Sequence, residues 1–225
     1  MSAPENSAAL SPLTLAPEAQ RQLFLDARTA NTFTDEPVTE EQVRAIHELV
    51  KYAPTSMNQQ PLRVVLVRSQ EARARLVAHM TGRNQEKTAQ APLVAVLAAD
   101  LDFHEELPRL VPFLENPQAI FADPGVREAS AHFNTALQVG YFILGVRAAG
   151  LAAGPMVGFD HAAVSKEFFG DGRHAAVCVV NIGKPGPDAW LGRLPRLEYE
   201  EVFRTVPAHW SSWSGEAKAS AALPW

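Results

Sequence analysis

Apolar positions recur with helical spacing in some segments and run continuously in others, which separates predicted helices from predicted strands. The best-marked helix follows the capping box Thr39-Glu40-Glu41-Gln42. It must end by Ala53, because Pro54 disfavours helical geometry in the residue before it. Its apolar stripe is formed by Val43, Ile46, Leu49 and Val50. Further helices are expected at about 18–28, 70–80, 84–90 and 160–169.

A long helix is predicted from Asp123-Pro124, an N-cap acid followed by proline, to about Ala149. Gly150 is expected to end it. Its second half is apolar on more than one side, which is typical of burial in a large core or at a subunit interface.

Three aliphatic, β-branched segments predict strands at 62–68, 92–99 and 175–182. Residues 101–122 combine large apolar residues with prolines and predict an irregular excursion or lid. Residues 197–206 are expected to form a short helix or an exchanged strand. Buried strands interleaved with helices predict an α/β or α+β layered domain.

Composition narrows the class of protein. The 225 residues are 47% hydrophobic and 20% charged, which is ordinary for a globular domain. A net charge of −5 without a basic tract argues against a nucleic-acid or anionic-membrane partner. Residues 1–17 lack the pattern of a signal peptide, and no stretch is apolar enough to span a membrane, so a cytoplasmic protein is expected.

Several kinds of catalytic site are not indicated. The single cysteine, Cys178, lies in a predicted buried strand and is interpreted as a core residue. The chain has no glycine-rich phosphate loop and no Gly-x-Ser-x-Gly elbow, and its histidines form no i,i+4 pairs. We therefore expect no metal site and no protein nucleophile.

Four polar segments carry chemistry suited to a ligand. Residues 28–33 offer a cation, a hydroxyl and an amide, and residues 54–61 hold two hydroxyls and three carboxamides between two prolines. Asn84 and Lys87 share a helix face at i,i+3. Residues 154–160 place glycine and proline before a capped helix, where backbone can approach a ligand closely. Near the C-terminus, Arg193 and Arg196 are candidate anion anchors.

The order of these segments, over roughly residues 20–206, resembles the nitroreductase family of FMN-dependent oxidoreductases. The most specific piece is Pro54-Thr55-Ser56-Met57-Asn58-Gln59-Gln60-Pro61, similar to the family's Pro-Ser-Ser-x-Asn-x-Gln-Pro loop. Within the family, the chain looks most like the malonic semialdehyde reductases of pyrimidine catabolism. The branch-like features are Ala27-Arg28-Thr29-Ala30-Asn31, Gly154-Pro155-Met156-Val157-Gly158-Phe159-Asp160 and Arg193-Leu194-Pro195-Arg196-Leu197.

The resemblance implies an α+β, nitroreductase-like fold, with a central, mostly antiparallel sheet flanked by helices. It also implies a homodimer with one FMN in each of two sites at the subunit interface. We accordingly expect a flexible N-terminal arm at 1–17, an FMN-binding domain at 18–206 and a C-terminal tail at 207–225 that has no counterpart in the family.

Site residues follow from the resemblance, motif by motif. Arg28 and Thr29 would lie at the phosphate and ribityl end, Asn31 at the pyrimidine edge, and Arg193 at the phosphate. The partner subunit would contribute Pro54, Thr55, Ser56 and Asn58. Asn84 and Lys87 would contact the pyrimidine ring, and the Pro155–Gly158 segment would place the backbone of Met156, Val157 and Gly158 at N5. One departure stands out. Ala27 and Asn31 occupy positions where the wider family often has arginine, so phosphate binding depends more on Arg28 and Arg193.

The implied activity is that of an NAD(P)H-dependent oxidoreductase working by ping-pong hydride transfer through flavin N5, with NADH or NADPH as the donor. No protein nucleophile is needed, and Lys87 would support the negative charge of reduced flavin. For the branch, the small acceptor would be malonic semialdehyde, reduced to 3-hydroxypropionate. Two alternatives remain: a broad nitroaromatic or quinone reductase using the same residues, and a non-catalytic flavin-binding protein.

Overall fold

The structure, a computed structural model, describes residues 13–170 and 172–206. Within the whole chain, one compact unit ends at Leu191 and a second begins at Gly192. The expected tail at 207–225, and most of the expected arm at 1–17, lie outside the described residues. The expected domain boundaries therefore stay a prediction.

The first unit is built on a four-stranded sheet in the order β1-β2-β4-β3. The strands are β1 (Leu62–Val67), β2 (Leu93–Asp100), β3 (Ala152–Met156) and β4 (His174–Gly183). Every pairing is antiparallel, as the resemblance implied. Sequence analysis missed β3, because Gly154 and Pro155 are poor strand formers. An edge strand tolerates Pro155, since only one of its sides must supply ladder N–H groups.

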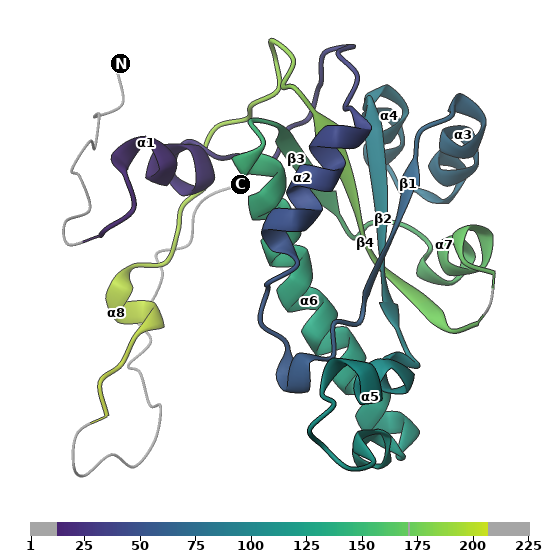
Figure 1. Ribbon diagram of the computed structural model, residues 1–225. Coiled ribbons are helices and arrows are strands. Elements are labelled where there is room, and N and C mark those ends of the chain that lie inside the picture. The colour runs from purple at the N-terminus through teal and green to yellow at the C-terminus, as the bar shows by residue number, and fades with distance from the viewer. Residues whose placement is uncertain (1–12, 171, 207–225) are drawn as a thin grey trace. The chain divides into compact units, whose positions relative to one another are not determined.

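Helices cover both faces of this sheet (Figure 1). On one face lie α2 (Glu40–Val50) and α6 (Pro124–Ala148), and on the other lie α3 (Gln70–His79), α4 (Asn84–Gln90) and α7 (His161–Phe168). The central strand β2 is wholly buried and serves both layers. Its alternate residues divide between the two cores: Leu93, Ala95 and Leu97 face α2 and α6, and Val94 and Val96 face the other helices.

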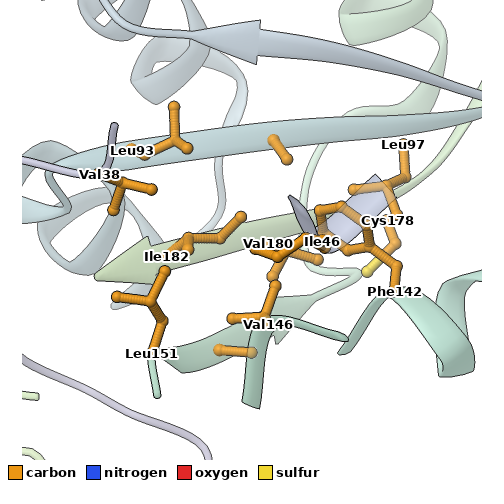
Figure 2. Close-up of a cluster of buried hydrophobic side chains, with 12 residues drawn as sticks. Val38, Ile46, Leu93, Leu97, Phe142, Val146, Leu151, Cys178, Val180 and Ile182 are labelled. Atoms are coloured by element: carbon orange, nitrogen blue, oxygen red, sulfur yellow. The ribbon is translucent and has the colours of Figure 1, made fainter. Parts of the chain in front are cut away.

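The core on the α2 and α6 face joins both helices to the sheet, as Figure 2 shows. Ile46 of α2 and Phe142 and Val146 of α6 pack against Val180 of β4. The two helices approach so closely that a Cβ atom at Gly145 would collide with a methyl group of Val50. Gly145 therefore sets the spacing of the layer that covers this face.

Helix starts agree with the predicted capping. Thr39 accepts a hydrogen bond from Gln42 N at 3.1 Å and donates from its own N–H to Gln42 Oε1 at 2.9 Å, which confirms the capping box. Asp123 accepts from Val126 N at 2.9 Å at the start of α6. The first predicted helix was too long. The chain forms α1 (Pro17–Gln20) followed by the π-helical turn η1 (Arg21–Leu25). The helical segment ends at Leu25, because residues 28–31 then run alongside β3.

Residues 101–122 form the predicted irregular excursion. It contains η3 (Phe103–Glu106), α5 (Leu107–Leu110) and η4 (Pro117–Phe121), with Phe103 and Phe121 buried edge to face. In the second unit, residues 197–206 contain the short helix α8 (Tyr199–Val202). None of the helices in the described part of the chain is long and apolar enough to cross a membrane.

Candidate functional site

Strand β3 brings two of the four polar segments together. Ala30 N donates to Ala153 O at 3.3 Å, which lays residues 28–31 alongside the strand. A Cβ atom at Gly154 would lie 2.9 Å from Ala30 O, closer than real Cβ atoms come. Glycine at this position is therefore what allows the first segment to lie against the fourth.

Helix α4 joins the same arrangement from the other side. Thr81 N and Asn84 Nδ2 donate to Gly158 O at 3.0 and 3.1 Å. A Cβ atom at Gly158 would lie 2.7 Å from Asn84 Nδ2 and 2.9 Å from Thr81 Oγ1. The Asn84–Lys87 segment and the 154–160 segment thus form one surface, and three of the four predicted segments converge around β3.

Lys87 lies one helical turn after Asn84 and is half-buried. Within residues 13–170 and 172–206, its ammonium group has no ion pair or hydrogen bond. Val157 is 68% exposed next to Gly158. The surface therefore combines an exposed backbone turn, a carboxamide and a cation, a set that suits a planar ligand with both donors and acceptors.

The first segment places its groups as follows. Arg28 is exposed, donates from Nη1 to Leu191 O at 3.3 Å, and lines a cavity of about 200 Å³ with Arg147 and Trp190. Thr29 is exposed beside it. Asn31 Nδ2 donates to Thr29 O at 3.3 Å and Ala189 O at 3.2 Å, which leaves its amide oxygen for a ligand. Arg193 belongs to the second unit and is exposed there.

The second segment, residues 54–61, lies at the opposite end of the sheet from the first. Leu62, which follows it, pairs with Ala99 at one end of β2, whereas Phe33 bridges Pro185 beside the end where Leu93 pairs with Ile182. The six steps from Leu93 to Ala99 span about 20 Å of strand. The loop also leads into β1, which lies at the sheet edge opposite β3, so one chain does not bring it to the surface that the other three segments form.

The 54–61 loop has an unusual backbone. Met57, Asn58 and Gln60 have φ values of 50°, 53° and 46°, in the left-handed region that non-glycine residues rarely adopt. Ser56 and Asn58 are exposed, and Asn58 Nδ2 donates to Leu110 O at 3.1 Å. The loop, including Pro54 and Thr55, borders a cavity of about 520 Å³ together with part of α2.

Sequence reasoning missed three groups that shape these segments. Thr81 contacts Gly158 as described above, and the ring of His161 lies between Val157 O and Ala176 O, at 3.1 and 2.9 Å. Asn134, on α6, accepts from Ser56 N at 2.7 Å. None of the three belongs to a local sequence motif, because each contact forms only when the chain is folded. Cys178 is buried, and burial raises the pKa of its thiol, as expected for a core residue rather than a nucleophile.

A sequence profile of the Nitroreductase family matches residues 26–184. The chain belongs to the nitroreductase family. A Streptomyces coelicolor protein, provisionally named NADH dehydrogenase/NAD(P)H nitroreductase, is 63% identical over 195 residues, covering 86% of this chain and 99% of the relative. A Leptothrix cholodnii protein of the same name is 47% identical over 183 residues, covering 81% and 93%.

Solved nitroreductase structures share the fold. A nitroreductase family protein from Streptococcus pneumoniae matches with a TM-score of 0.73 at 24% identity, covering 84% of this chain and 98% of that one. A provisionally named nitroreductase from Exiguobacterium sibiricum, in complex with FMN, matches with a TM-score of 0.73 at 21% identity, covering 86% and 98%. The predicted family and nitroreductase-like fold are thus confirmed, and the finer likeness to malonic semialdehyde reductases stays a prediction.

Proposed function

We propose that this nitroreductase-family chain is an NAD(P)H-dependent FMN oxidoreductase that acts as a homodimer on a small acceptor. The observation that carries the proposal is the separation of the four polar segments. Three lie around the edge strand β3, while the 54–61 loop leads into β1 at the opposite edge of the sheet and lies about 20 Å along the strands from the first segment. In a symmetric dimer, the loop of one subunit completes the site of the other.

The residues around β3 fit FMN by their chemistry. Gly158 and Gly154 let the three segments pack closely into one surface, and Asn84 presents a carboxamide for the mixed donor and acceptor edge of the ring. The half-buried ammonium of Lys87 suits the N1 and O2 side of the flavin. When bound, FMN supplies the hydride chemistry, accepting from NADH or NADPH and passing the hydride to the acceptor.

Each remaining segment has its own part in this proposal. Arg28 and Thr29 bind the phosphate and ribityl end, and Asn31 offers its amide oxygen toward the pyrimidine edge. Arg193 stays a separate candidate for the phosphate. The exposed turn from Pro155 to Gly158 borders the N5 side, where hydride donor and acceptor bind in turn. Pro54, Thr55, Ser56 and Asn58 reach the flavin from the partner subunit.

The surface of α6 supports the homodimer. Phe133, Leu137 and Tyr141 follow one another at i,i+4 spacing and are 66%, 40% and 42% exposed. Tyr52, which follows the end of α2, is 78% exposed. Large apolar side chains gathered in this way are typical of a protein–protein interface. A second copy of the chain is the partner that also completes the flavin site.

For the acceptor, we propose an aldehyde with a terminal carboxylate, malonic semialdehyde first, by likeness to that branch. Arg83 and Arg109 are the alternatives for the basic residue that pairs with this carboxylate. Arg109 forms a two-nitrogen ion pair with Glu106, at 3.0 and 2.8 Å. Arg83 is exposed beside Asn84 and, in the described ranges, its guanidinium has no hydrogen bond or ion pair. Arg83 is therefore the better candidate.

A broad nitroaromatic or quinone reductase is the second candidate function, favoured by the names of the relatives. It uses the same flavin residues and differs only in the acceptor. We also propose that the protein acts in the cytoplasm, and its acidic net charge argues against a nucleic-acid or anionic-membrane partner.

The test is a steady-state screen of the purified protein with NADH and NADPH. The acceptors are malonic semialdehyde, propionaldehyde, a nitroaromatic compound and a quinone. We expect a yellow protein whose flavin bleaches rapidly with reduced nicotinamide and is reoxidised by acceptor. A higher kcat/KM for malonic semialdehyde than for propionaldehyde would support the carboxylate proposal, and equal values would count against it. Slow bleaching without turnover would favour the non-catalytic flavin-binding protein instead.

A further inference from the structure

The inner face of α6 carries a row of polar side chains that the proposed function does not use. Ser130, Asn134 and Gln138 follow one another at i,i+4 spacing, and Asn134 is 1% exposed. A buried carboxamide is costly unless its hydrogen bonds are made, so the partners of this row indicate what it does.

Among the described residues, the partners of this row outside α6 belong to the 54–61 loop or to the residue that follows it. Asn134 Oδ1 accepts from Ser56 N at 2.7 Å, and Asn134 Nδ2 donates to Gln59 Oε1 at 3.1 Å. Ser130 Oγ donates to the same Gln59 oxygen at 2.9 Å. Gln138 Oε1 accepts from Leu62 N at 2.9 Å. The row therefore fixes the loop at its start, its middle and its end.

The loop needs such support because its backbone is strained. Three of its residues, Met57, Asn58 and Gln60, have left-handed φ values without being glycine. L-residues avoid this region because Cβ comes too close to the backbone, and such conformations persist only where the surroundings hold them. Glycine would give the same turn without strain, so the structure retains side chains here against their backbone preference.

The strained conformation has a clear geometric result. The backbone N–H of Ser56 and the side chain of Gln59 turn inward to α6, and Gln59 is 1% exposed. The side chains of Ser56 and Asn58 remain exposed on the outer side. Inward hydrogen bonds and outward side chains are thus two consequences of one conformation.

We propose that Asn134 is a positioning residue of the flavin site. It holds the 54–61 loop in the conformation that presents Thr55, Ser56 and Asn58 to the flavin of the partner subunit. The inference rests on the proposed function, because it takes the loop to contribute to the partner's site. Asn134 itself does not touch the flavin and acts only through the loop.

The first test changes α6. Asn134→Leu removes both bonds to the loop, and Thr135→Val is the matched control. Thr135 is fully buried on the same helix, and its hydroxyl has no hydrogen-bond partner in the described structure. Apo protein is titrated with FMN while quenching of flavin fluorescence is followed. We expect Asn134→Leu to raise the Kd about ten-fold, the worth of one buried hydrogen bond, and Thr135→Val to leave it unchanged.

A conservative variant provides the rescue. Asn134→Asp keeps an oxygen for Ser56 N–H, and Gln59 can turn its side chain to offer Nε2, which has no partner in the described structure. Asn134→Asp is therefore expected to bind FMN more tightly than Asn134→Leu, whereas equal weakening by both would contradict the inference. The thermal midpoint and dimer mass of each apo variant show whether the change is confined to the flavin site.

The second test changes the loop and does not depend on Asn134→Leu folding. Ser56→Pro removes the N–H that Asn134 accepts, while Ser56→Ala removes only the hydroxyl. Proline fits the first position of η2 (Ser56–Asn58), and Thr55 before it is already extended. We expect Ser56→Pro to bind FMN more weakly than Ser56→Ala.

Equal Kd values for Ser56→Pro and Ser56→Ala would overturn the inference, as would a folded Asn134→Leu protein with the wild-type Kd. A Thr135→Val protein as weak as Asn134→Leu would also overturn it, because the effect would then be general damage to the core. Wild-type protein that binds no FMN would contradict the proposed function and this inference together.

Discussion

At the scale of single residues, the proposed function depends most on the charge of Lys87. Its ammonium group is half-buried on the same helix as Asn84, and no acidic side chain neutralises it within the described residues. A cation held in this way is available to a ligand that becomes more negative during a reaction. A flavin gains negative charge on reduction, so Lys87 should favour the reduced form.

Lys87→Met is expected to lower the two-electron potential of bound FMN by about 20–45 mV, which corresponds to about 1–2 kcal/mol of lost stabilisation. Reduction by NAD(P)H should slow more than FMN binding weakens, because the phosphate contacts are unchanged. Equilibration with a reference dye measures the potential. Lys166→Met, on the exposed face of α7, is the control. An unchanged potential and unchanged reduction rate would place Lys87 outside the site.

Asp100 is the fully buried carboxylate at the end of β2, where it meets two arginines. Arg63 Nη2 donates to it at 2.7 Å, and Arg173 donates from Nε and Nη2 at 2.6 and 2.9 Å. Burial favours the neutral acid, but the hydrogen bond from Arg173, the charge of Arg63 and the backbone N–H of Asp102 together lower the pKa of this carboxyl. The ionised form therefore stabilises the folded state.

The sign of the pH dependence follows. Because the folded pKa lies below the unfolded value of about 3.9, the stabilisation is complete above that pH and is lost as pH falls through the folded pKa. Asp100→Asn should reduce the free energy of unfolding by about 3 kcal/mol at pH 7, since it removes the buried negative charge to which both arginines bind. Urea unfolding at several pH values measures this.

The difference between wild type and Asp100→Asn should shrink below about pH 4, where the unfolded-state carboxyl is protonated. Glu40→Gln is the control, because its pairs with Arg44 and Arg68 are on the surface and contribute little. A difference that is constant from pH 7 to pH 3 would show that shape, rather than charge, makes Asp100 important.

At the scale of elements, local patterns predicted most of the helices and strands. The Thr39 capping box and the Asp123-Pro124 start are local signals, and both mark helix starts in the structure. Strand β3 escaped prediction because its Gly154-Pro155 core reads as a turn, and only pairing with β4 makes it a strand. Likewise, Asn134 and Gln138 interrupt an apolar pattern, and only the folded loop shows why. Contacts between distant segments leave no such local signal.

The turn after β3 provides a test of how closely α4 packs there. Gly158→Ala would place a methyl group 2.7 Å from Asn84 Nδ2 and 2.9 Å from Thr81 Oγ1. Both side chains must then move, so FMN should bind more weakly and reduction by NAD(P)H should slow. Titration with FMN and stopped-flow reduction measure the two effects. Ala162→Ser, an exposed change on the first turn of α7, should alter neither. Wild-type behaviour of Gly158→Ala would separate this turn from the flavin.

At the scale of the whole molecule, the sequence indicated the family's site but not how one chain could build it. The loop at 54–61 leads into β1, and the other three segments lie around β3 at the opposite edge of the sheet, a consequence of strand order that no motif encodes. The apolar residues of α6 also lie on two sides of the helix with different surroundings. The side of the helix that carries Phe142 and Val146 enters the core, and the side with Phe133 and Leu137 is exposed. Periodicity indicated both sides without assigning either to core or interface.

The homodimer links these observations, and its disruption should remove the flavin. Wild-type protein is expected at twice the 24.5 kDa mass of the chain, with one FMN per chain. The double variant Phe133→Lys with Leu137→Lys places two charges on the exposed apolar side of α6, where an interface must exclude water. We expect a folded monomer that has lost most of its FMN, because each site then lacks the partner's 54–61 loop.

Light scattering coupled to gel filtration gives the mass of this double variant, and absorbance gives its flavin content. Ala74→Lys, on the exposed side of α3 across the sheet, should leave both unchanged. A monomeric double variant that keeps its full FMN would show that one chain builds the site alone, and would contradict the shared site.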